Sequence, residues 1–597
     1  MGKPILLTPH LTRVVSHYKK FDLEVPRELL DGRPVRPDLR DFPYPLPRPK
    51  QAYVCSCAGE GGVKWFGADG GVTRYDPYAD SLADVVQYCS APRDLLDNNV
   101  QNLLADGTGV WVLTESGATH IEMKRMSAAE KAELLLRETL TIVDRRGMVS
   151  QRALSEARNL ASAVPYGHSD NDGGFTALFA IGEIFHYETL RREYGDYDRR
   201  TLAQREVACR ASEGALLLMY IAGRGNGFVA RSYVTKSEPV PDDGLFFKKN
   251  GATACCLNTE FARKRRMVGV ECPADSPIPE RLRKLYADEG YEDDDITYKG
   301  DTSSDEITFH YLHLLVAHEF LGREDAEYDT LLRTAAVNTM THIIDNGFTL
   351  HDATDEPTTW AKWNPEYFAT PDGYADAALN SAEVMMYLRV TMRLTGEEGR
   401  WKKAYDHLLS IGYGDLPMQH FDRFHQVCMA MHVDDREEMM YGDHGLAVAA
   451  FWGLITLEPD PELREKFRRG FRSWLNTIEP EYNPGYYFLY MLSDPDNADP
   501  DEERIRTWFA RANVSRLAAG VSLDRRVDIP ARVLRGGALE TSALLAQDER
   551  FISKYDRDPY DYKNEDSGGV YTVECCTPFT FAYWLGRYFK FIEEADA

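Results

Sequence analysis

The chain of 597 residues is 43% hydrophobic and 27% charged, a composition typical of large globular proteins with more than one domain. Its formal net charge of −26 does not provide the basic face on which nucleic-acid binding depends, so we expect no nucleic-acid partner. No stretch of about 18 consecutive apolar residues occurs in the sequence, so we also expect no membrane partner.

The ten cysteines are spread along the sequence without the dense spacing of a disulfide framework, which favours reduced thiols. The first residues, Met1-Gly-Lys-Pro-Ile-Leu-Leu, contain neither a sustained apolar core nor a small-residue cleavage site. Both features predict a cytoplasmic protein without a secretory signal.

Residues 1–50 end in a segment with a high density of proline, from Arg33 to Pro49. Proline fixes the φ angle and lacks a backbone N–H, so residues 1–50 are predicted to form an extended arm. Such an arm could wrap a neighbouring subunit of a homo-oligomer.

Two self-similar stretches follow the arm, at residues 62–76 and 109–122. Each has the pattern of a strand, a glycine-containing turn and a second strand. They resemble the hairpins of bacterial sensor-type β-propeller repeats. Two hairpins cannot close a propeller, so residues 51–124 are predicted to form a small β domain that caps the rest of the chain.

From Ser127 onward the hydrophobic period is that of helices. Ser127 and Glu130 form a capping box, which predicts a helix that runs to about Arg145. Five pairs of helices with short turns follow, at 175–194 with 199–222, 303–321 with 325–345, 376–395 with 400–411, 444–457 with 461–477, and 486–493 with 501–517. A last helix at 579–594 could pair with the first. Six helical hairpins predict a mainly α fold in which residues 125–597 form a closed (α/α)6 toroid.

Six helical hairpins whose inner helices begin with polar residues resemble the (α/α)6 toroid of many glycoside hydrolases and polysaccharide lyases. The blocks Gly300-Asp-Thr-Ser-Ser-Asp-Glu, Thr358-Thr-Trp-Ala-Lys-Trp-Asn-Pro-Glu-Tyr and Trp584-Leu-Gly-Arg-Tyr are also similar to bacterial proteins of unassigned activity that often carry propeller repeats upstream. The resemblance covers roughly residues 125–597. It implies a carbohydrate-active enzyme but does not name the reaction, because fold does not settle chemistry.

Polar clusters precede the inner helices, so they would line the end of the toroid at which those helices begin, which we call the mouth. His168, Asp170 and Asp172 lie in a glycine-bounded loop before one inner helix. They could supply a general base and hydroxyl-binding carboxylates, or they could be helix caps beside a hydrogen-bonding histidine. Both interpretations stay open from the sequence.

A second cluster contains Asp301, Asp305 and Glu306, at the start of the helix predicted over 303–321. Two adjacent acids at a helix start can simply stabilise the helix dipole. Crowded carboxyl groups also raise one another's pKa, as a general acid at neutral pH requires. The sequence supports the two interpretations equally.

The loop from Thr358 to Tyr367 contains two tryptophans among polar side chains. Indole rings stack on the apolar faces of sugars, and the polar side chains could contact hydroxyl groups, which predicts a substrate wall. The alternative is that the tryptophans attach the loop to the core. The candidate binding residues of this loop are Trp360, Lys362, Trp363, Asn364 and Tyr367, with Glu366 as a reserve acid.

Further candidates lie at the starts of later helices. Asp443 and His444 stand between two glycines, where a carboxylate beside an imidazole could activate it, or where both could belong to a capped helix. Tyr374, Tyr487 and Arg587 complete the predicted binding residues.

No metal or cofactor is predicted. His310 and His313 share a helical face, but no second ligand block with matching spacing supports them, so we interpret them as core histidines. The vicinal pairs Cys255-Cys256 and Cys575-Cys576 resemble the cysteine pair with which one toroid family of arabinofuranosidases binds zinc. The resemblance stops at the pair, because no matching Glu-x-Cys element follows.

The leading hypothesis is a glycoside hydrolase that acts on an oligosaccharide or glycoside. Its mouth would hold one protonated and one ionised carboxyl group across the scissile bond. The expected pair is Asp170 or Asp172 on one side and Asp305 or Glu306 on the other.

The alternative is a polysaccharide lyase that cleaves a uronic-acid-containing glycan by β-elimination. The residues that could supply its base and neutralise the carboxylate are His168, Asn364, His444, Tyr487 and Arg587. A third hypothesis is a carbohydrate-binding protein without catalysis. In each case the expected partner is a carbohydrate.

Overall fold

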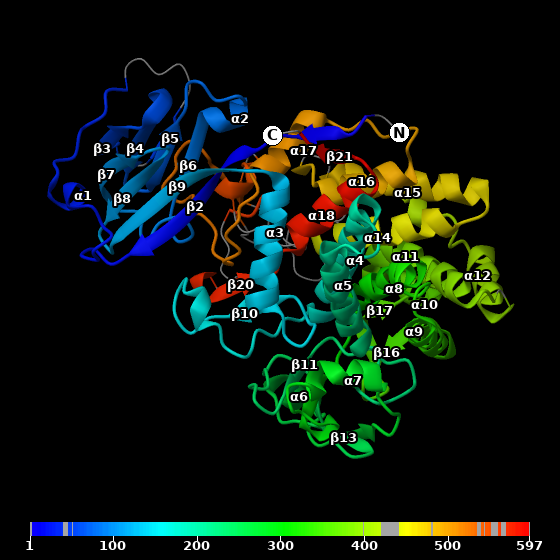
Figure 1. Ribbon diagram of the computed structural model, residues 1–597. Helices are drawn as coiled ribbons and strands as arrows, with labels where there is room; N and C mark the ends of the chain where they lie inside the picture. Colours follow the sequence, from blue (N-terminus) through cyan, green and yellow to red (C-terminus); the bar gives the residue numbers. More distant parts are fainter. Residues whose placement is uncertain are drawn as a thin grey trace.

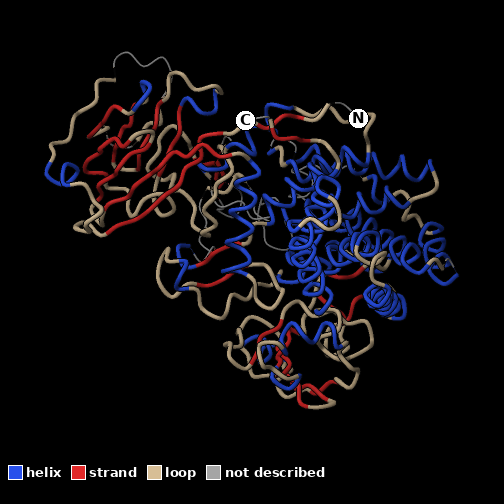
Figure 2. Tube along the Cα trace, in the orientation of Figure 1, coloured by secondary structure: helices blue, strands red, loops and turns tan. Residues whose placement is uncertain are grey.

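The structure is a computed structural model that describes residues 3–39, 46–49, 52–397, 399–419, 441–478, 481–533, 539–541, 544–550, 559–562 and 569–595. A β-rich region lies beside a large helical region, and a smaller part with short strands extends from the helical region (Figure 1). Figure 2 shows that helices dominate the larger region and strands the region at its side. The fold is therefore mainly helical, with a sizeable content of sheet.

The β-rich region consists of two four-stranded antiparallel sheets. The first has the order β2 (His10–Tyr18), β9 (Ala118–Met126), β8 (Gly109–Thr114) and β7 (Val100–Asp106). The second has the order β3 (Cys55–Ala58), β4 (Lys64–Ala68), β5 (Gly71–Tyr75) and β6 (Val86–Cys89). Both predicted hairpins are present, as β4–β5 and β8–β9. Buried side chains of the two sheets, among them Trp65, Val110 and Ile121, form one apolar core.

The first 31 residues differ from the extended arm that the proline content predicts. β1 (Ile5–Leu7) pairs in parallel with β21 (Ile592–Glu594), and β2 pairs along its length with β9. α1 (Arg27–Asp31) buries Leu29 against the β-rich region. Residues 33–39 and 46–48, which belong to the proline-dense segment, have neither helix nor strand, so the prediction fits that part of the described residues.

Helices occupy part of every predicted helical segment, but the helix predicted over 199–222 ends at residue 217 and the one predicted over 501–517 ends at residue 510. Their bounds are α3 (Ala128–Glu138), α4 (Asp172–Tyr194), α5 (Arg199–Leu217), α8 (Ser304–Phe320), α9 (Ala326–Asp345), α11 (Pro371–Thr395), α12 (Gly399–Ser410), α14 (Tyr441–Leu457), α15 (Pro461–Ile478), α16 (Pro484–Ser493), α17 (Glu502–Ala510) and α18 (Thr577–Tyr588). Two short helical segments, α2 (Leu82–Val85) and α10 (Pro365–Phe368), lie in loops. The capping box of Ser127 and Glu130 is present at the start of α3. The predicted helix over 579–594 is shorter, since the chain turns after Tyr588 and enters β21.

Six of the described helices pack in a circuit. α4 contacts α8, α8 contacts α11, α11 contacts α14, α14 contacts α16, α16 contacts α18, and α18 contacts α4. These inner helices are buried on almost all sides, as the unbroken buried run from Glu306 to Ala317 in α8 shows. The second helix of each hairpin lies outside and buries one stripe, for example Phe467, Phe471 and Trp474 of α15.

The inner helices run in the same direction. Thr308 of α8 meets Glu383 of α11, and one turn later Tyr311 stacks on Tyr387 at a ring distance of 4.7 Å. Contacts between α18 and α4 advance together in the same way. Their N-terminal ends therefore face the same side, which is the mouth.

The segment of the chain that connects α5 to α8 forms a sheet that the sequence did not predict. Its five strands have the order β11 (Tyr233–Thr235), β15 (Ile296–Lys299), β12 (Phe246–Asn250), β13 (Thr253–Cys256) and β14 (Glu271–Pro273), with α6 (Glu260–Arg265) and α7 (Glu280–Ala287) beside it. β15 ends at Lys299 and leads directly to the start of α8. Short antiparallel strands β16 (Thr349–His351) and β17 (Pro357–Lys362) carry the loop toward α11.

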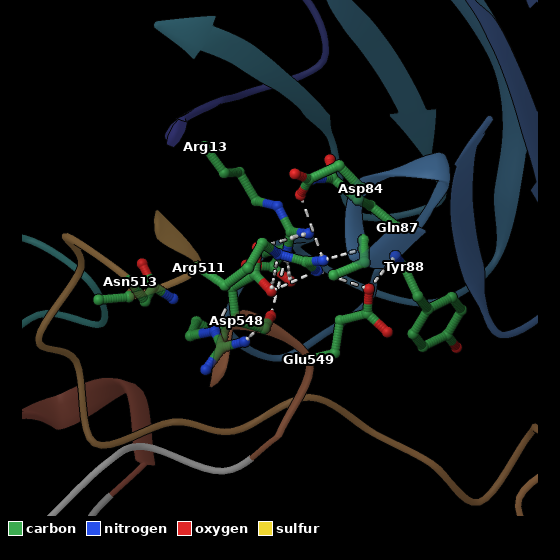
Figure 3. A network of polar contacts seen from close by, with 12 residues as sticks. Arg13, Asp84, Gln87, Tyr88, Arg511, Asn513, Asp548 and Glu549 are labelled. Atoms are coloured by element: carbon green, nitrogen blue, oxygen red, sulfur yellow. Dashed lines mark hydrogen bonds and ion pairs between the residues drawn. The ribbon is translucent and has the colours of Figure 1, made fainter. Parts of the chain in front are cut away.

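Buried ion pairs between side chains attach the β-rich region to the helical region (Figure 3). Arg13 of β2 pairs with Asp94 at 2.9 Å and lies 3.5 Å from Asp548. Arg511, just after α17, pairs with Asp548 at 2.5 Å and with Glu549 at 2.8 Å. Among the described helices, none combines the length and apolar character that crossing a membrane requires.

Candidate active site

Three inner helices bring carboxyl groups together at the mouth. Asp305 and Glu306 stand in the first turn of α8, Asp443 stands in the first turn of α14, and Glu383 lies midway along α11. Asp305 raises the pKa of both Glu306 and Glu383, and Asp443 raises the pKa of Glu383. The four groups therefore form one electrostatically coupled cluster, which we call the carboxyl cluster.

Glu306 is fully buried against the start of α4. The backbone N–H of Gly174 donates to its Oε2 at 2.5 Å, and a Cβ at Gly173 would lie only 2.3 Å from that oxygen. The helix start can approach the carboxyl group this closely because Gly173 has no side chain. Burial raises the pKa of Glu306 to about 8, against the opposing effect of Arg231 and with a further rise from Asp305. Glu306 is therefore protonated at neutral pH.

Glu383 is a second buried acid, and the sequence analysis did not include it among the site residues. The indole Nε1–H of Trp363 donates to its Oε2 at 2.9 Å. Thr308 lies 2.8 Å from its Oε1 and 2.7 Å from the hydroxyl of Tyr387. Burial raises the pKa of Glu383 to about 8, the contacts with Trp363 and Thr308 lower it, and Asp305 and Asp443 raise it again. Glu383 is therefore also protonated at neutral pH.

Asp305 is the member of α8 that solvent reaches, with a side chain that is 44% exposed. The hydroxyl of Ser303 donates to its Oδ1 at 3.1 Å, and Arg231 Nη2 lies 3.6 Å from its Oδ2. Asp443 is partly exposed as well. The carboxyl cluster thus pairs two protonated, buried acids with two acids that a substrate can reach.

A second group of charges lies beside the carboxyl cluster, at the loop before α4. Lys299 Nζ contacts the carboxylate of Asp170 and lies 3.6 Å from Asp243 and 3.8 Å from Asp301. His168 Nε2 lies 3.6 Å from Asp170 and 3.5 Å from Asp243. We call these five residues the aspartate–lysine cluster. Asp243 and Lys299 are not among the predicted site residues, because a sheet that the sequence did not predict brings them to the mouth.

The charges of this cluster shift two ionisation equilibria. Burial lowers the pKa of His168, but the carboxylates of Asp170 and Asp243 outweigh it, so the net pKa is raised. Burial raises the pKa of Asp170, but His168 and Lys299 outweigh it and hold that pKa well below its usual range. Asp170 is therefore ionised at neutral pH.

Asp172 does not face this cluster freely. Its carboxylate is fully buried, pairs with Arg145 at 2.7 Å and accepts a hydrogen bond from Ser232. Arg145 in turn pairs with Glu238 at 3.0 Å. Asp172 was expected to be either a helix cap or a site carboxylate; the N-cap of α4 is Asn171, and the contacts of Asp172 are those of a buried ion pair at the helix start.

The loop from Thr358 to Tyr367 divides its residues between core and surface. Trp363 is fully buried and bonded to Glu383, so it cannot stack on a sugar. Trp360 remains exposed on β17. The other polar residues contact one another: Lys362 lies over the ring of Tyr367 at 5.5 Å, and the side-chain amide of Asn364 donates to Glu366 at 3.1 Å.

The remaining predicted residues lie in different surroundings. Tyr374 is exposed at the start of α11. His444 is buried and packs edge-on against Trp474 at a ring distance of 5.0 Å. Tyr487 is buried, and its hydroxyl donates to the backbone carbonyl of Asp499 at 2.9 Å. Arg587 stands at the last turn of α18 and pairs with Glu193 at the last turn of α4, so it lies at the end opposite the mouth.

The residues with metal-like spacing in the sequence lie in different surroundings, and neither ring nitrogen of His310 has a hydrogen-bond partner among the described residues. His313 is buried and lies 2.6 Å from the hydroxyl of Ser212, and His310 is buried beside it. Cys575 contacts Thr577 and Cys576 contacts Thr580, both at the start of α18. The other vicinal pair, Cys255 and Cys256, lies on β13 of the separate five-stranded sheet.

No protein family and no curated protein matches the sequence. Among solved structures, the chain is similar to a metagenome-derived glycoside hydrolase family 9 endoglucanase, with 9% sequence identity and a TM-score of 0.31. The alignment covers 99% of this chain and 98% of that chain. A TM-score of this size does not establish a common fold.

Proposed function

We propose that the protein is a glycoside hydrolase whose residues 125–597 form an (α/α)6 toroid, with its active site at the mouth. The circuit of six parallel inner helices supports the toroid. The carboxyl cluster at the start of these helices supports the reaction, because hydrolysis of a glycosidic bond needs one carboxyl group that is protonated and one that is ionised.

The observation that carries the proposal is that two solvent-accessible acids, Asp305 and Asp443, flank the buried Glu383. Hydrolysis of a glycosidic bond would use one of these two carboxyl groups in its charged form and the other in its protonated form. The charged one would activate water, and the protonated one would donate to the leaving oxygen. Glu306 and Glu383 have no exposed surface, so we assign them to tuning the charge of the site.

Asp170 suits a binding role better than a base. An efficient general base has a pKa near the working pH, whereas Lys299 and His168 hold the pKa of Asp170 far below it. Trp360 and Tyr374, both exposed, would provide aromatic surface for a sugar ring.

The test is product analysis on a panel of neutral and uronic oligosaccharides, with reducing ends and ultraviolet absorbance followed together. We expect new reducing ends without absorbance. We also expect Asp305→Asn and Asp443→Asn each to lower kcat by about 10²–10⁴-fold, the usual contribution of general acid–base catalysis. Activity that survives both substitutions would refute the assignment.

The lyase alternative keeps His168 at the mouth, but two other residues that it needs are poorly placed. Of the residues that it would use, Tyr487 is buried and bonded to the backbone, and Arg587 lies at the opposite end of the inner helices. Absorbance that rises with cleavage would nevertheless show elimination and overturn the proposal. Binding without turnover would indicate the carbohydrate-binding protein.

A further inference from the structure

The aspartate–lysine cluster contains a buried histidine, His168, that lies at ion-pair distance from the carboxylates of Asp170 and Asp243. The His168 side chain is only 9% exposed, and neither ring nitrogen makes a hydrogen bond to a described residue. Its ring is held edge-on against Phe246 at 5.5 Å, with Nε2 directed at the carboxylates of Asp170 and Asp243. These ion-pair contacts are longer than a good hydrogen bond, so a ligand hydroxyl between the imidazole and a carboxylate would complete the hydrogen bonding of the ring.

The carboxylates opposite His168 are accessible to a ligand. The side chains of Asp170 and Asp243 are 51% and 54% exposed. The Lys299 ammonium contacts Asp170 and lies 3.6 Å from Asp243. The fully buried ammonium of Lys299 fixes their spacing, and Asp301 lies on its other side, anchored by the backbone N–H of Leu245 at 2.6 Å. Two preorganised acceptors and one donor thus face the same space.

A metal ion is the first ligand to consider. One ligand atom each of His168, Asp170 and Asp243 can be chosen so that all lie within 4.8 Å of one another. However, the Lys299 ammonium contacts Asp170 and lies 3.6 Å from Asp243, so it stands next to the position that a cation would take. A divalent ion bound there would face this ammonium at close range, which is unfavourable in a partly buried site. A neutral ligand with hydroxyl groups meets no such repulsion.

We propose that His168, Asp170 and Asp243 form a subsite for two neighbouring hydroxyl groups of a neutral sugar, and that the subsite excludes uronic acids. Each half-exposed carboxylate accepts a hydrogen bond from one hydroxyl, and the imidazole of His168 donates to an oxygen of the sugar. A uronate would bring a third carboxylate to Asp170 and Asp243, and like-charge contacts reject a partner. This inference rests on the proposed function for the origin of the sugar, but its test does not depend on turnover.

The test is isothermal titration of the full chain with glucose, galactose, mannose and xylose, and with glucuronic and galacturonic acid. We expect at least one neutral sugar to bind, and its matching uronic acid to bind about tenfold more weakly or not at all. Asp243→Asn should weaken the neutral sugar by about tenfold, since it removes a charged acceptor. The control is Asp242→Asn, which removes the same charge one residue away, where Asp242 accepts from the backbone N–H of Glu260.

Each contrary outcome overturns the proposal in a different way. Equal binding of neutral sugars and uronic acids would refute the charge selection, and equal effects of the two substitutions would refute the site. Binding of zinc or calcium chloride alone that Asp243→Asn abolishes would identify a metal site instead. Absence of sugar binding to the wild type refutes the subsite, whereas sugar binding without hydrolysis refutes only the proposed activity.

Discussion

Replacement of Glu383 by glutamine tests whether this buried acid is protonated. Glutamine mimics the protonated form: its carbonyl oxygen can accept from Trp363, and its amide can donate to the hydroxyl of Thr308. Glutamine does not titrate, so a comparison of the two proteins across pH isolates the ionisation of Glu383.

The expected effect follows from proton linkage. The pKa of Glu383 rises from 4.5 to about 8 on folding, so the folded state binds the proton more tightly than the unfolded chain. The wild type therefore loses stability as the pH rises from about 4.5 to about 8, whereas the glutamine variant does not lose this contribution. At about 1.4 kcal/mol for each tenfold change in the ionisation constant, the upper limit of the difference is about 5 kcal/mol.

The assay is urea unfolding of both proteins at about pH 5, 6, 7 and 8, with the difference in free energy of unfolding plotted against pH. We expect Glu383→Gln to be nearly neutral at the lowest pH and increasingly stabilising above it. Glu306 titrates in the same range but is present in both proteins, so its contribution cancels. A difference that stays constant from about pH 5 to pH 8 would show that Glu383 is ionised throughout and would refute the reasoning.

Two further substitutions test the supports of the site and of the fold. Trp363→Phe keeps an aromatic ring but removes the N–H that donates to Glu383, so we expect a loss of about 1–3 kcal/mol in urea unfolding. An unchanged stability would show that the indole only fills space. Arg511→Met removes a buried cation between Asp548 and Glu549, so we expect a loss of about 3–5 kcal/mol, measured by thermal unfolding, with sugar binding preserved in the folded fraction. A cost of less than about 1 kcal/mol would mean that the ion pairs contribute little to the attachment of the β-rich region.

The helices and the two β-hairpins could be predicted because their signals are local. The capping box of Ser127 and Glu130 and the glycine-containing turns lie within a few residues of the elements that they start or connect. The five-stranded sheet was not predicted, because its strands are only three to five residues long and carry too little periodicity to be distinguished from a loop.

The site was predicted only in part, for reasons of tertiary structure. Asp305 and Glu306 stand at the start of α8, and the sequence pattern of a helix start is what identified them. Glu383 lies in the middle of α11, and it reaches the mouth because α11 begins well before the level at which α8 starts. Burial raises the pKa of Glu383, and Trp363 and Thr308 supply its hydrogen bonds. The spacing of residues in the sequence reveals neither effect. Arg587 lies in the last turn of α18 because that helix ends at Tyr588, whereas the predicted bounds of 579–594 put it near the middle, so its distance from the mouth could not be predicted.

The packing of α18 against α4 has a consequence for synthesis on the ribosome. α4 leaves the ribosome long before α18 is translated, yet its Phe185 stacks on Tyr588 and its His186 stacks on Trp584. Until α18 emerges, these stacking contacts of α4 cannot form, and apolar surface that stays exposed favours association between nascent chains. The rate at which the last part of the chain is translated therefore sets how long each new molecule stays vulnerable.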